Sequence, residues 1–267
     1  MDLPSRPRLA PGLRVVRRGT GHLQVGLHPD RRAVLPRTPL VEEALAALLD
    51  HRPADPAVLT TLHRHGCLVD DTDRTGDGRR HGTRVAVHGG LASERALLAA
   101  AGLRVVGAGH HASVALVAVT GEPDRALLDP FVRSGTPHLV ARVVDGGAVL
   151  GPFVVPGATP CLRCLDSEAA LADPDHVAVT ERYTRASARE RSDGLPDVLD
   201  PVLPTLAAAW AVRDVVAHLD GIRPSTWSRT LHLAAEPGPP REQVWARHPA
   251  CGCSWLGPDL PSGTMGA

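Results

Sequence analysis

Two close cysteine pairs limit what this chain can fold into more than any other feature. Cys161 and Cys164 are separated by two residues, Cys251 and Cys253 by one, and 86 residues (165–250) lie between the pairs. A tetrahedral zinc site is built in this way, because each tight turn supplies two thiolates and the two turns join distant segments. A thioredoxin-type redox pair and cysteines without a common role are the alternatives, but a redox pair leaves Cys251 and Cys253 unexplained. Four thiolates leave no position for water, so such a zinc is structural.

The composition indicates a globular chain with an ordinary core. Hydrophobic residues make up 43% of it and the formal net charge is zero, so nothing favours nucleic acid or a membrane as a partner. We expect no signal peptide and no apolar run near the roughly 18 residues of a membrane span, which predicts a cytoplasmic protein. All 29 basic side chains are arginine, which excludes any mechanism that needs a lysine amine. The fifth cysteine, Cys67, is expected to be a buried, inert thiol.

Residues 1–70 are predicted to form a small unit of their own. Three short strand-like runs are separated by turn residues and predict a meander, and two helical patterns and a short strand follow. The second helix has Asp55 as its expected cap. The expected strands are 13–19, 22–27, 31–35 and 67–69, and the helices begin at Pro39 and after Asp55. Residues 71–83 contain no aliphatic side chain and are dense in charge and glycine, so they are expected to be a linker.

Residues 84–267 are predicted to form an α/β domain. Apolar strand-like runs alternate with helical patterns, which indicates βαβ units and a mainly parallel sheet. The expected strands are 84–88, 103–107, 114–120, 138–144, 148–157, 226–234 and 242–248, and the expected helices are 91–101, 124–134 and 201–221. Residues 172–200 are polar and irregular and are expected to be an exposed loop, and the sequence assigns no role to residues 174–199.

The stretch GAVLGPFVVPGATPCLRCLD, the α/β pattern before it and the distant CGC resemble the ThiF/MoeB-like adenylyltransferase fold, which also underlies ubiquitin-activating enzymes. The resemblance covers roughly residues 84–255. It implies a Rossmann-type α/β domain whose four cysteines bind zinc. The second cysteine pair departs from the family by having one residue between its cysteines where two is usual.

The residues that bind nucleotide in this family are altered here. Of the glycine-rich turn only Gly89 and Gly90 remain, because His88 and Ala92 break the spacing that lets backbone amides approach phosphates. Gly121 stands where the family has a magnesium-binding aspartate, the acidic residue after the second strand is missing, and no thioester cysteine lies between the two pairs. The resemblance therefore implies that ATP does not bind this chain, and no catalytic residue is assigned.

An α/β domain without nucleotide-binding residues, preceded by a module of strands and helices, resembles the ThiF-like partner proteins of azoline-forming peptide pathways, identified as bacteriocin cyclodehydratase or leader-peptide-binding proteins. In that family a small winged-helix domain similar to PqqD binds the leader of a precursor peptide as an added strand. The resemblance implies a YcaO-type ATP-dependent cyclodehydratase as partner and the possibility of a homodimer. It places the peptide against Ala33, Val34 and Leu35, with Val58 and Leu62 on the facing helix, although these aliphatic side chains can equally be core.

Other functions stay open. The chain could be an active ThiF-like adenylyltransferase acting on the C-terminus of a carrier protein, an oxidoreductase on a Rossmann-like sheet, or a non-catalytic scaffold. Binding of ATP with magnesium would favour the adenylyltransferase over the leader-binding role. Binding of NAD(P) would favour the oxidoreductase. The motif GHH at 109–111 is expected to be a solvated loop, and HLDGIRPSTW at 218–227 carries no assigned chemistry.

Overall fold

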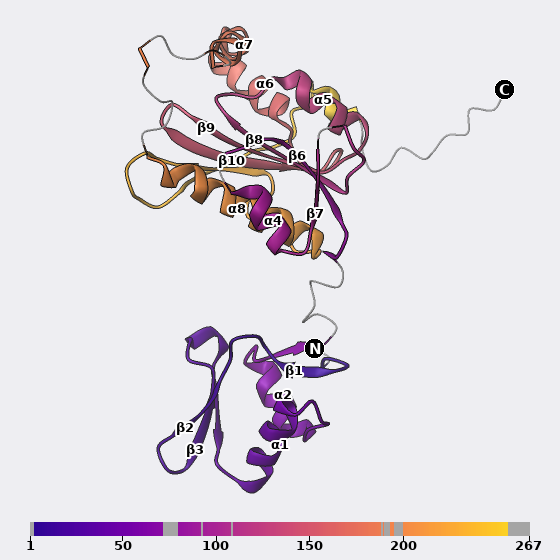
Figure 1. Cartoon of the computed structure of the whole chain (residues 1–267), viewed down its shortest axis with the longest axis vertical. Coiled ribbons are helices and arrows are strands. Elements are labelled where there is room, and N and C mark those ends of the chain that lie inside the picture. The colour runs from indigo at the N-terminus through magenta and orange to yellow at the C-terminus, as the bar shows by residue number, and fades with distance from the viewer. Residues whose placement is uncertain are drawn as a thin grey trace, which may run out of the picture. The chain divides into compact units, whose positions relative to one another are not determined.

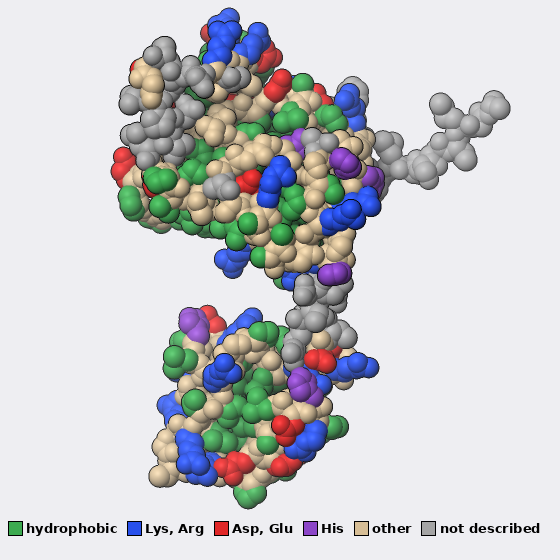
Figure 2. All heavy atoms as spheres, viewed as in Figure 1, with side chains coloured by type: hydrophobic (Ala, Val, Ile, Leu, Met, Phe, Trp, Pro, Cys, Tyr) green, Lys and Arg blue, Asp and Glu red, His purple; other side chains and the backbone are tan. Residues whose placement is uncertain are grey.

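The computed structural model describes residues 3–71, 80–91, 93–107, 109–187, 189, 193–194 and 200–255. The chain divides into two compact units, Met1–Arg79 (unit 1) and Arg80–Ala267 (unit 2), drawn in Figure 1. Most of the predicted linker, residues 72–79, lies outside the described residues. On the face of each unit seen in Figure 2, basic and acidic side chains are interspersed.

Unit 1 contains the predicted three-stranded meander, in the antiparallel order β2-β3-β4. Two helices follow, and a two-stranded ladder of β1 and β5 joins the start and end of the unit. The elements are β1 (Pro7–Leu9), β2 (Val15–Arg18), β3 (His22–Val25), β4 (Ala33–Pro36), α1 (Pro39–Leu49), α2 (Pro56–Arg64) and β5 (Leu68–Asp70). As expected, Asp55 caps α2 and a proline opens α1; Thr38 also caps α1 by accepting a backbone N–H bond, and a proline opens α2 as well.

The five residues assigned to peptide contact lie in two different environments. Ala33, Leu35, Val58 and Leu62 are at most 4% exposed and belong to the core of unit 1, whereas Val34 is 41% exposed. The strand alternation explains this, because β4 turns every second side chain away from the core. The remaining predicted core residue, the Cys67 thiol, is buried as expected, and burial raises its pKa.

Unit 2 is built on a seven-stranded sheet in the order β12-β11-β10-β9-β8-β6-β7. Its strands are β6 (Arg84–Gly89), β7 (Arg104–Val106), β8 (Val114–Thr120), β9 (His138–Val144), β10 (Gly147–Val154), β11 (Arg229–Leu233) and β12 (Arg241–Val244). The expectation of a mainly parallel sheet is wrong, since three of the six strand pairings are antiparallel. One of these pairings follows from the two-residue turn Asp145–Gly146, which is too short for a helical crossover and makes β10 antiparallel to β9.

Helices cover both faces of this sheet (Figure 1). Helices α4 (Glu94–Ala100) and α8 (Val202–Leu219) pack on one face, and α5 (Arg125–Arg133) and α6 (Leu162–Ala172) pack on the other. By length and composition alone, α8 could cross a membrane, which the sequence expectation missed. Seven of its residues are buried against the sheet and α4, so α8 is a core helix of unit 2.

The predicted exposed loop at 172–200 is wrong in its first half. Residues His176–Ser187 form the helix α7, which packs beside α6. None of its twelve described residues is buried, so it lacks the apolar stripe by which a core helix is recognised in a sequence. Polar contacts hold it instead, among them the bond from Tyr183 Oη to Asp145 at 2.8 Å. Residues 188, 190–192 and 195–199 lie outside the described part of the chain.

Candidate metal centre and sheet-edge site

The four predicted cysteine ligands meet at one point of unit 2. Cys161 precedes the first turn of α6 and Cys164 lies within that turn, while Cys251 and Cys253 come from the short helical turn η2 (Gly252–Trp255) and the residue before it. Thr159 fixes the chain segment between β10 and α6, because its hydroxyl accepts a hydrogen bond from the N–H of Val155 and donates one to the carbonyl of Phe153. All four side chains are buried.

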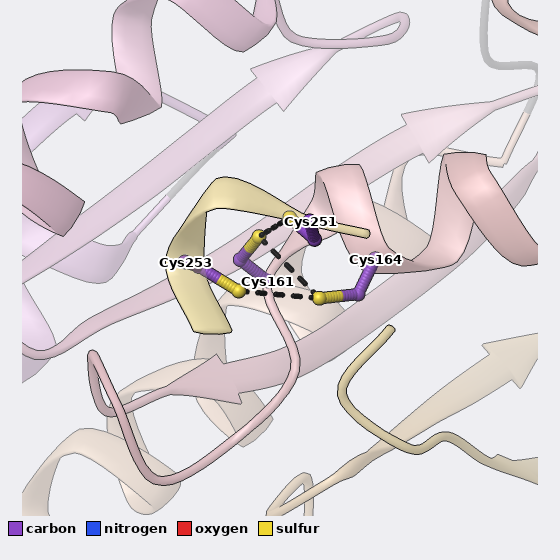
Figure 3. Close-up of side chains that lie close together, drawn as sticks. All are labelled: Cys161, Cys164, Cys251 and Cys253. Atoms are coloured by element: carbon purple, nitrogen blue, oxygen red, sulfur yellow. Dashed lines mark hydrogen bonds between the residues drawn. The ribbon is translucent and has the colours of Figure 1, made fainter. Parts of the chain in front are cut away.

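The sulfur positions fit a tetrahedral metal ion. Cys161 Sγ lies 3.8 Å from Cys164 Sγ and 3.6 Å from Cys251 Sγ, and Cys164 Sγ lies 3.3 Å from Cys253 Sγ (Figure 3). All four sulfurs are within 4.8 Å of one another. A zinc ion with Zn–S bonds of about 2.3 Å holds its sulfurs about 3.8 Å apart. The cluster can therefore hold a metal ion with little movement of the side chains.

The electrostatics of the cluster also call for a cation. Hydrogen bonds from the thiols of Cys161 and Cys253 lower the pKa of Cys164 well below its usual range. The same contact with Cys164 raises the pKa of Cys161, and burial raises it further. A bound cation removes this competition, because it stabilises all four thiolates together.

Gly89 and Gly90, which the resemblance assigns to a nucleotide-binding turn, are closely packed by other residues of the chain. Gly89 has a φ of +76°, and a Cβ there would overlap the carbonyl oxygen of Ala118, so glycine is required where β6 approaches β8. Next to Gly90 lies the carboxylate of Glu94, a residue only 2% exposed, which accepts the N–H of Leu91 at 3.3 Å. A fixed carboxylate thus occupies the start of α4, where a nucleotide-binding loop presents amides to phosphate.

Gly121, which the resemblance places at a magnesium-binding position, is also closely packed. Gly121 has a φ of +83°, and a Cβ at this position would lie 2.5 Å from Cβ of Ser187, the last residue of α7. The end of α7 therefore sits in the space that a side chain at position 121 needs. No carboxylate can be accommodated there without moving α7.

We expect Gly121→Ala to lower the free energy of unfolding of unit 2 more than Gly146→Ala does. Both residues have a positive φ, but at Gly146 no atom lies within 4 Å of the place that an added methyl group would take. The backbone strain costs about 1–3 kcal/mol at each site, and overpacking against Ser187 adds about 1–3 kcal/mol at Gly121 only. Urea unfolding followed by circular dichroism measures both losses. Equal losses would show that Ser187 does not pack on Gly121, and Ser187→Gly should recover part of the Gly121→Ala loss.

The sequence matches no protein-family model, and no curated protein matches it. Solved structures do match. The heterocyclase TruD superposes with a TM-score of 0.68 at 17% identity, over 95% of this chain and 43% of that chain. E. coli MccB superposes with a TM-score of 0.59 at 13% identity, over 93% of this chain and 96% of that chain. The Microcin C7 biosynthetic enzyme MccB in complex with N-formylated MccA has a TM-score of 0.61 at 13% identity, over 93% and 99% of the two chains.

The chain shares the fold of these proteins. At such low identity the likeness concerns the fold alone, and it confirms the expected ThiF/MoeB-like α/β architecture. The chain spans less than half of the length of TruD, so it corresponds to one part of that protein.

A buried ion-pair network near the C-terminal ends of the central strands β8 and β9 was not predicted. Arg125 forms two hydrogen bonds with Asp166, at 2.7 and 2.8 Å, and its Nη2 lies 2.7 Å from Glu122. Arg142 Nε lies 2.9 Å from the other oxygen of Glu122, and the four side chains are between 10% and 13% exposed. The one available signal was Arg142 itself, a charge in the middle of the apolar run HLVARVV.

The two remaining sequence motifs have structural explanations. His110 and His111 of the GHH motif are exposed, as predicted. The segment HLDGIRPSTW is held by Asp214 of α8, which is 3% exposed and accepts the backbone N–H and hydroxyl groups of both Ser225 and Thr226. This network fixes the turn between α8 and β11, and accounts for the Ser-Thr pair without any catalytic role.

Proposed function

We propose that this chain is the non-catalytic partner of a YcaO-type cyclodehydratase in the cytoplasm. It binds the leader of a ribosomally made precursor peptide and presents the peptide for azoline formation, while the partner supplies the ATP-dependent chemistry. The observation that carries this proposal is the close packing of Ala118, Glu94 and Ser187 around Gly89, Gly90 and Gly121, the glycines that the resemblance assigns to a nucleotide site. Binding and positioning then remain as its contribution. The shared fold with a heterocyclase and with an enzyme solved with the peptide MccA supports a peptide ligand.

The strand β4 offers the edge to which a leader can add. In the described part of unit 1 it is the last strand of the meander. The N–H of Arg37 bonds to the carbonyl of Gly21, so the alternation of the antiparallel ladder turns the backbone of Leu35 and Ala33 toward β3. The backbone N–H and C=O of Val34 therefore point outward, ready to pair with an added strand.

The buried residues have a supporting role in this proposal. The side chains of Ala33, Leu35, Val58 and Leu62 hold β4 from inside the core, so we assign the peptide contacts to the backbone and the exposed side chain of Val34. Pro36, two residues further on, has no N–H to offer and marks the end of the free edge. The peptide thus gains affinity from main-chain bonds and gains register from the side chains around Val34.

We assign zinc to the four-cysteine centre as a structural ion. It joins the start of α6 to residues 251–253 and leaves no site for a substrate, because four thiolates complete its shell. A homodimer is a further expectation that rests on resemblance only.

A genomic and a binding test address the proposal together. We expect a YcaO gene and a short open reading frame rich in Cys, Ser or Thr beside the gene for this chain. The fluorescently labelled N-terminal half of that short peptide should bind the purified chain in an anisotropy titration. If neither gene is present and labelled candidate leaders fail to bind, the proposal is wrong.

The adenylyltransferase alternative makes the opposite prediction for nucleotide. We expect calorimetry with ATP and magnesium to show no saturable heat, because Glu94 and Ser187 pack where the resemblance assigns the phosphate-binding turn and the metal ligand. Micromolar affinity for ATP would favour the adenylyltransferase instead.

A further inference from the structure

A pocket of about 290 Å³ lies in unit 2 where β9 ends, beneath α6 and α7. Apolar side chains form much of its wall, among them Leu162, Leu165, Val179 and Trp245. All four residues of the ion-pair network described above also line the pocket, namely Glu122, Arg125, Arg142 and Asp166. Eight of its fourteen lining residues are polar or charged, so the pocket combines an apolar wall with convergent polar groups that can fix the orientation of a ligand.

Arg142 brings unused hydrogen-bond donors to this pocket. Its Nη1 atom is shielded from solvent and has no hydrogen-bond partner among the residues that the structure describes, whereas its Nε lies 2.9 Å from the carboxylate of Glu122. A guanidinium carries several N–H donors and no acceptor. Leaving such donors buried and unpaired is costly, so the arrangement points to an acceptor that this chain does not itself provide.

The charges of the network favour an uncharged acceptor. Arg125 and Arg142 balance Glu122 and Asp166, so an added anion would leave excess negative charge in a largely buried site. Asp145, at the same end of β9, adds to that negative charge. A neutral oxygen can accept from Arg142 without this cost.

The pocket also offers an acceptor for an N–H group. Asp145 and Tyr183 are bonded to each other at 2.8 Å, and both line the pocket. Tyr183 belongs to α7, which contributes no buried residue and is therefore held by few core contacts.

We propose that this pocket binds a carboxamide, the amide unit of a peptide. The carbonyl oxygen accepts from the guanidinium of Arg142, and the amide N–H donates to Asp145 or to Tyr183 Oη. This site lies in unit 2, whereas the strand β4 proposed to pair with the leader belongs to unit 1. The inference rests on the proposed function only in taking the amide to be part of a precursor peptide.

Two small probes of equal size test the proposal without any precursor peptide. N-acetylglycinamide carries two amides, and N-acetylglycine replaces one of them by a carboxylate. In the purified full chain labelled with ¹⁵N-arginine, N-acetylglycinamide should shift the Nε–H signal of Arg142 in a saturable manner and bind more tightly than N-acetylglycine. Arg142→Met should weaken its binding by at least about tenfold, as expected for loss of bonds from a charged donor.

Two further variants control for folding. Arg163→Gln removes an arginine that pairs with Asp129 outside the pocket, and should leave binding unchanged. Val179→Trp fills the pocket from a residue that is 51% exposed, and should abolish binding without disturbing the ion pairs. Tighter binding of N-acetylglycine, no saturable binding of either probe, or an equal loss in Arg163→Gln would each overturn the proposal. None of these results depends on whether unit 1 binds a leader.

Discussion

Cys161→Ser is expected to release the metal and to unfold most of unit 2. Cys161 lies at the centre of the cluster, within 3.8 Å of both Cys164 and Cys251, and its loss leaves three thiolates without a closed shell. Metal binding is coupled to folding in such sites, and a structural zinc contributes about 10–16 kcal/mol in small peptides at neutral pH. Metal analysis of the purified wild-type chain should give about one equivalent of zinc. Urea unfolding should show the loss of stability in the variant.

Cys67→Ser is the matched control for this experiment. It makes the same chemical change at a buried thiol, but in the core of unit 1 and away from the cluster. We expect it to keep the full equivalent of zinc and to destabilise unit 1 only. A wild-type chain without metal, or a Cys161→Ser variant that retains a full equivalent, would contradict the assignment of the four cysteines.

The second large effect is expected at the edge of unit 1. Val34→Pro should weaken leader binding by at least about tenfold, because it removes the outward N–H and places a ring where the added strand must pair. Edge strands tolerate proline on their free side, and Pro36 already stands on this strand, so unit 1 should stay folded. Fluorescence anisotropy with a labelled leader measures the affinity, and circular dichroism checks the fold.

Arg17→Pro on the opposite edge provides the comparison. The N–H of Gly26 bonds to the carbonyl of Arg14, and the alternation along β2 then points the N–H of Arg17 away from β3. The two variants thus make the same change on the two edges of one sheet. If Arg17→Pro weakens binding and Val34→Pro does not, the leader adds to β2 and our assignment of β4 is wrong.

The parts of the structure that local patterns determine could be predicted from the sequence. The four metal ligands follow from spacing within two tight turns, and the cap Asp55 bonds to N–H groups two and three residues away. The meander follows from short runs separated by turn residues. The cap and the turns depend on contacts between residues that are close in the chain, and the cysteine pairs, although they meet across 90 positions, are recognised by the local spacing within each pair.

Features that depend on distant contacts escaped prediction. Helix α7 has no buried residue, so no apolar periodicity marked it, and its contact with Gly121 joins segments 66 positions apart (121 and 187). The pairing of Arg125 with Asp166 likewise spans 41 positions. The peptide-contact residues were predicted as a group, but the pleat of β4 separates Val34 from its buried neighbours. Only the strand register showed which backbone groups are free.

The most direct test of the central claim is reconstitution with the expected partner. The precursor peptide would be incubated with ATP and magnesium together with this chain, with the neighbouring YcaO-type enzyme, or with both, and its mass followed over time. We predict that one water is lost per ring only when both proteins are present, that Val34→Pro slows this loss at low peptide concentration, and that this chain alone leaves the peptide unchanged. Adenylation or dehydration of the peptide by this chain alone would contradict the account.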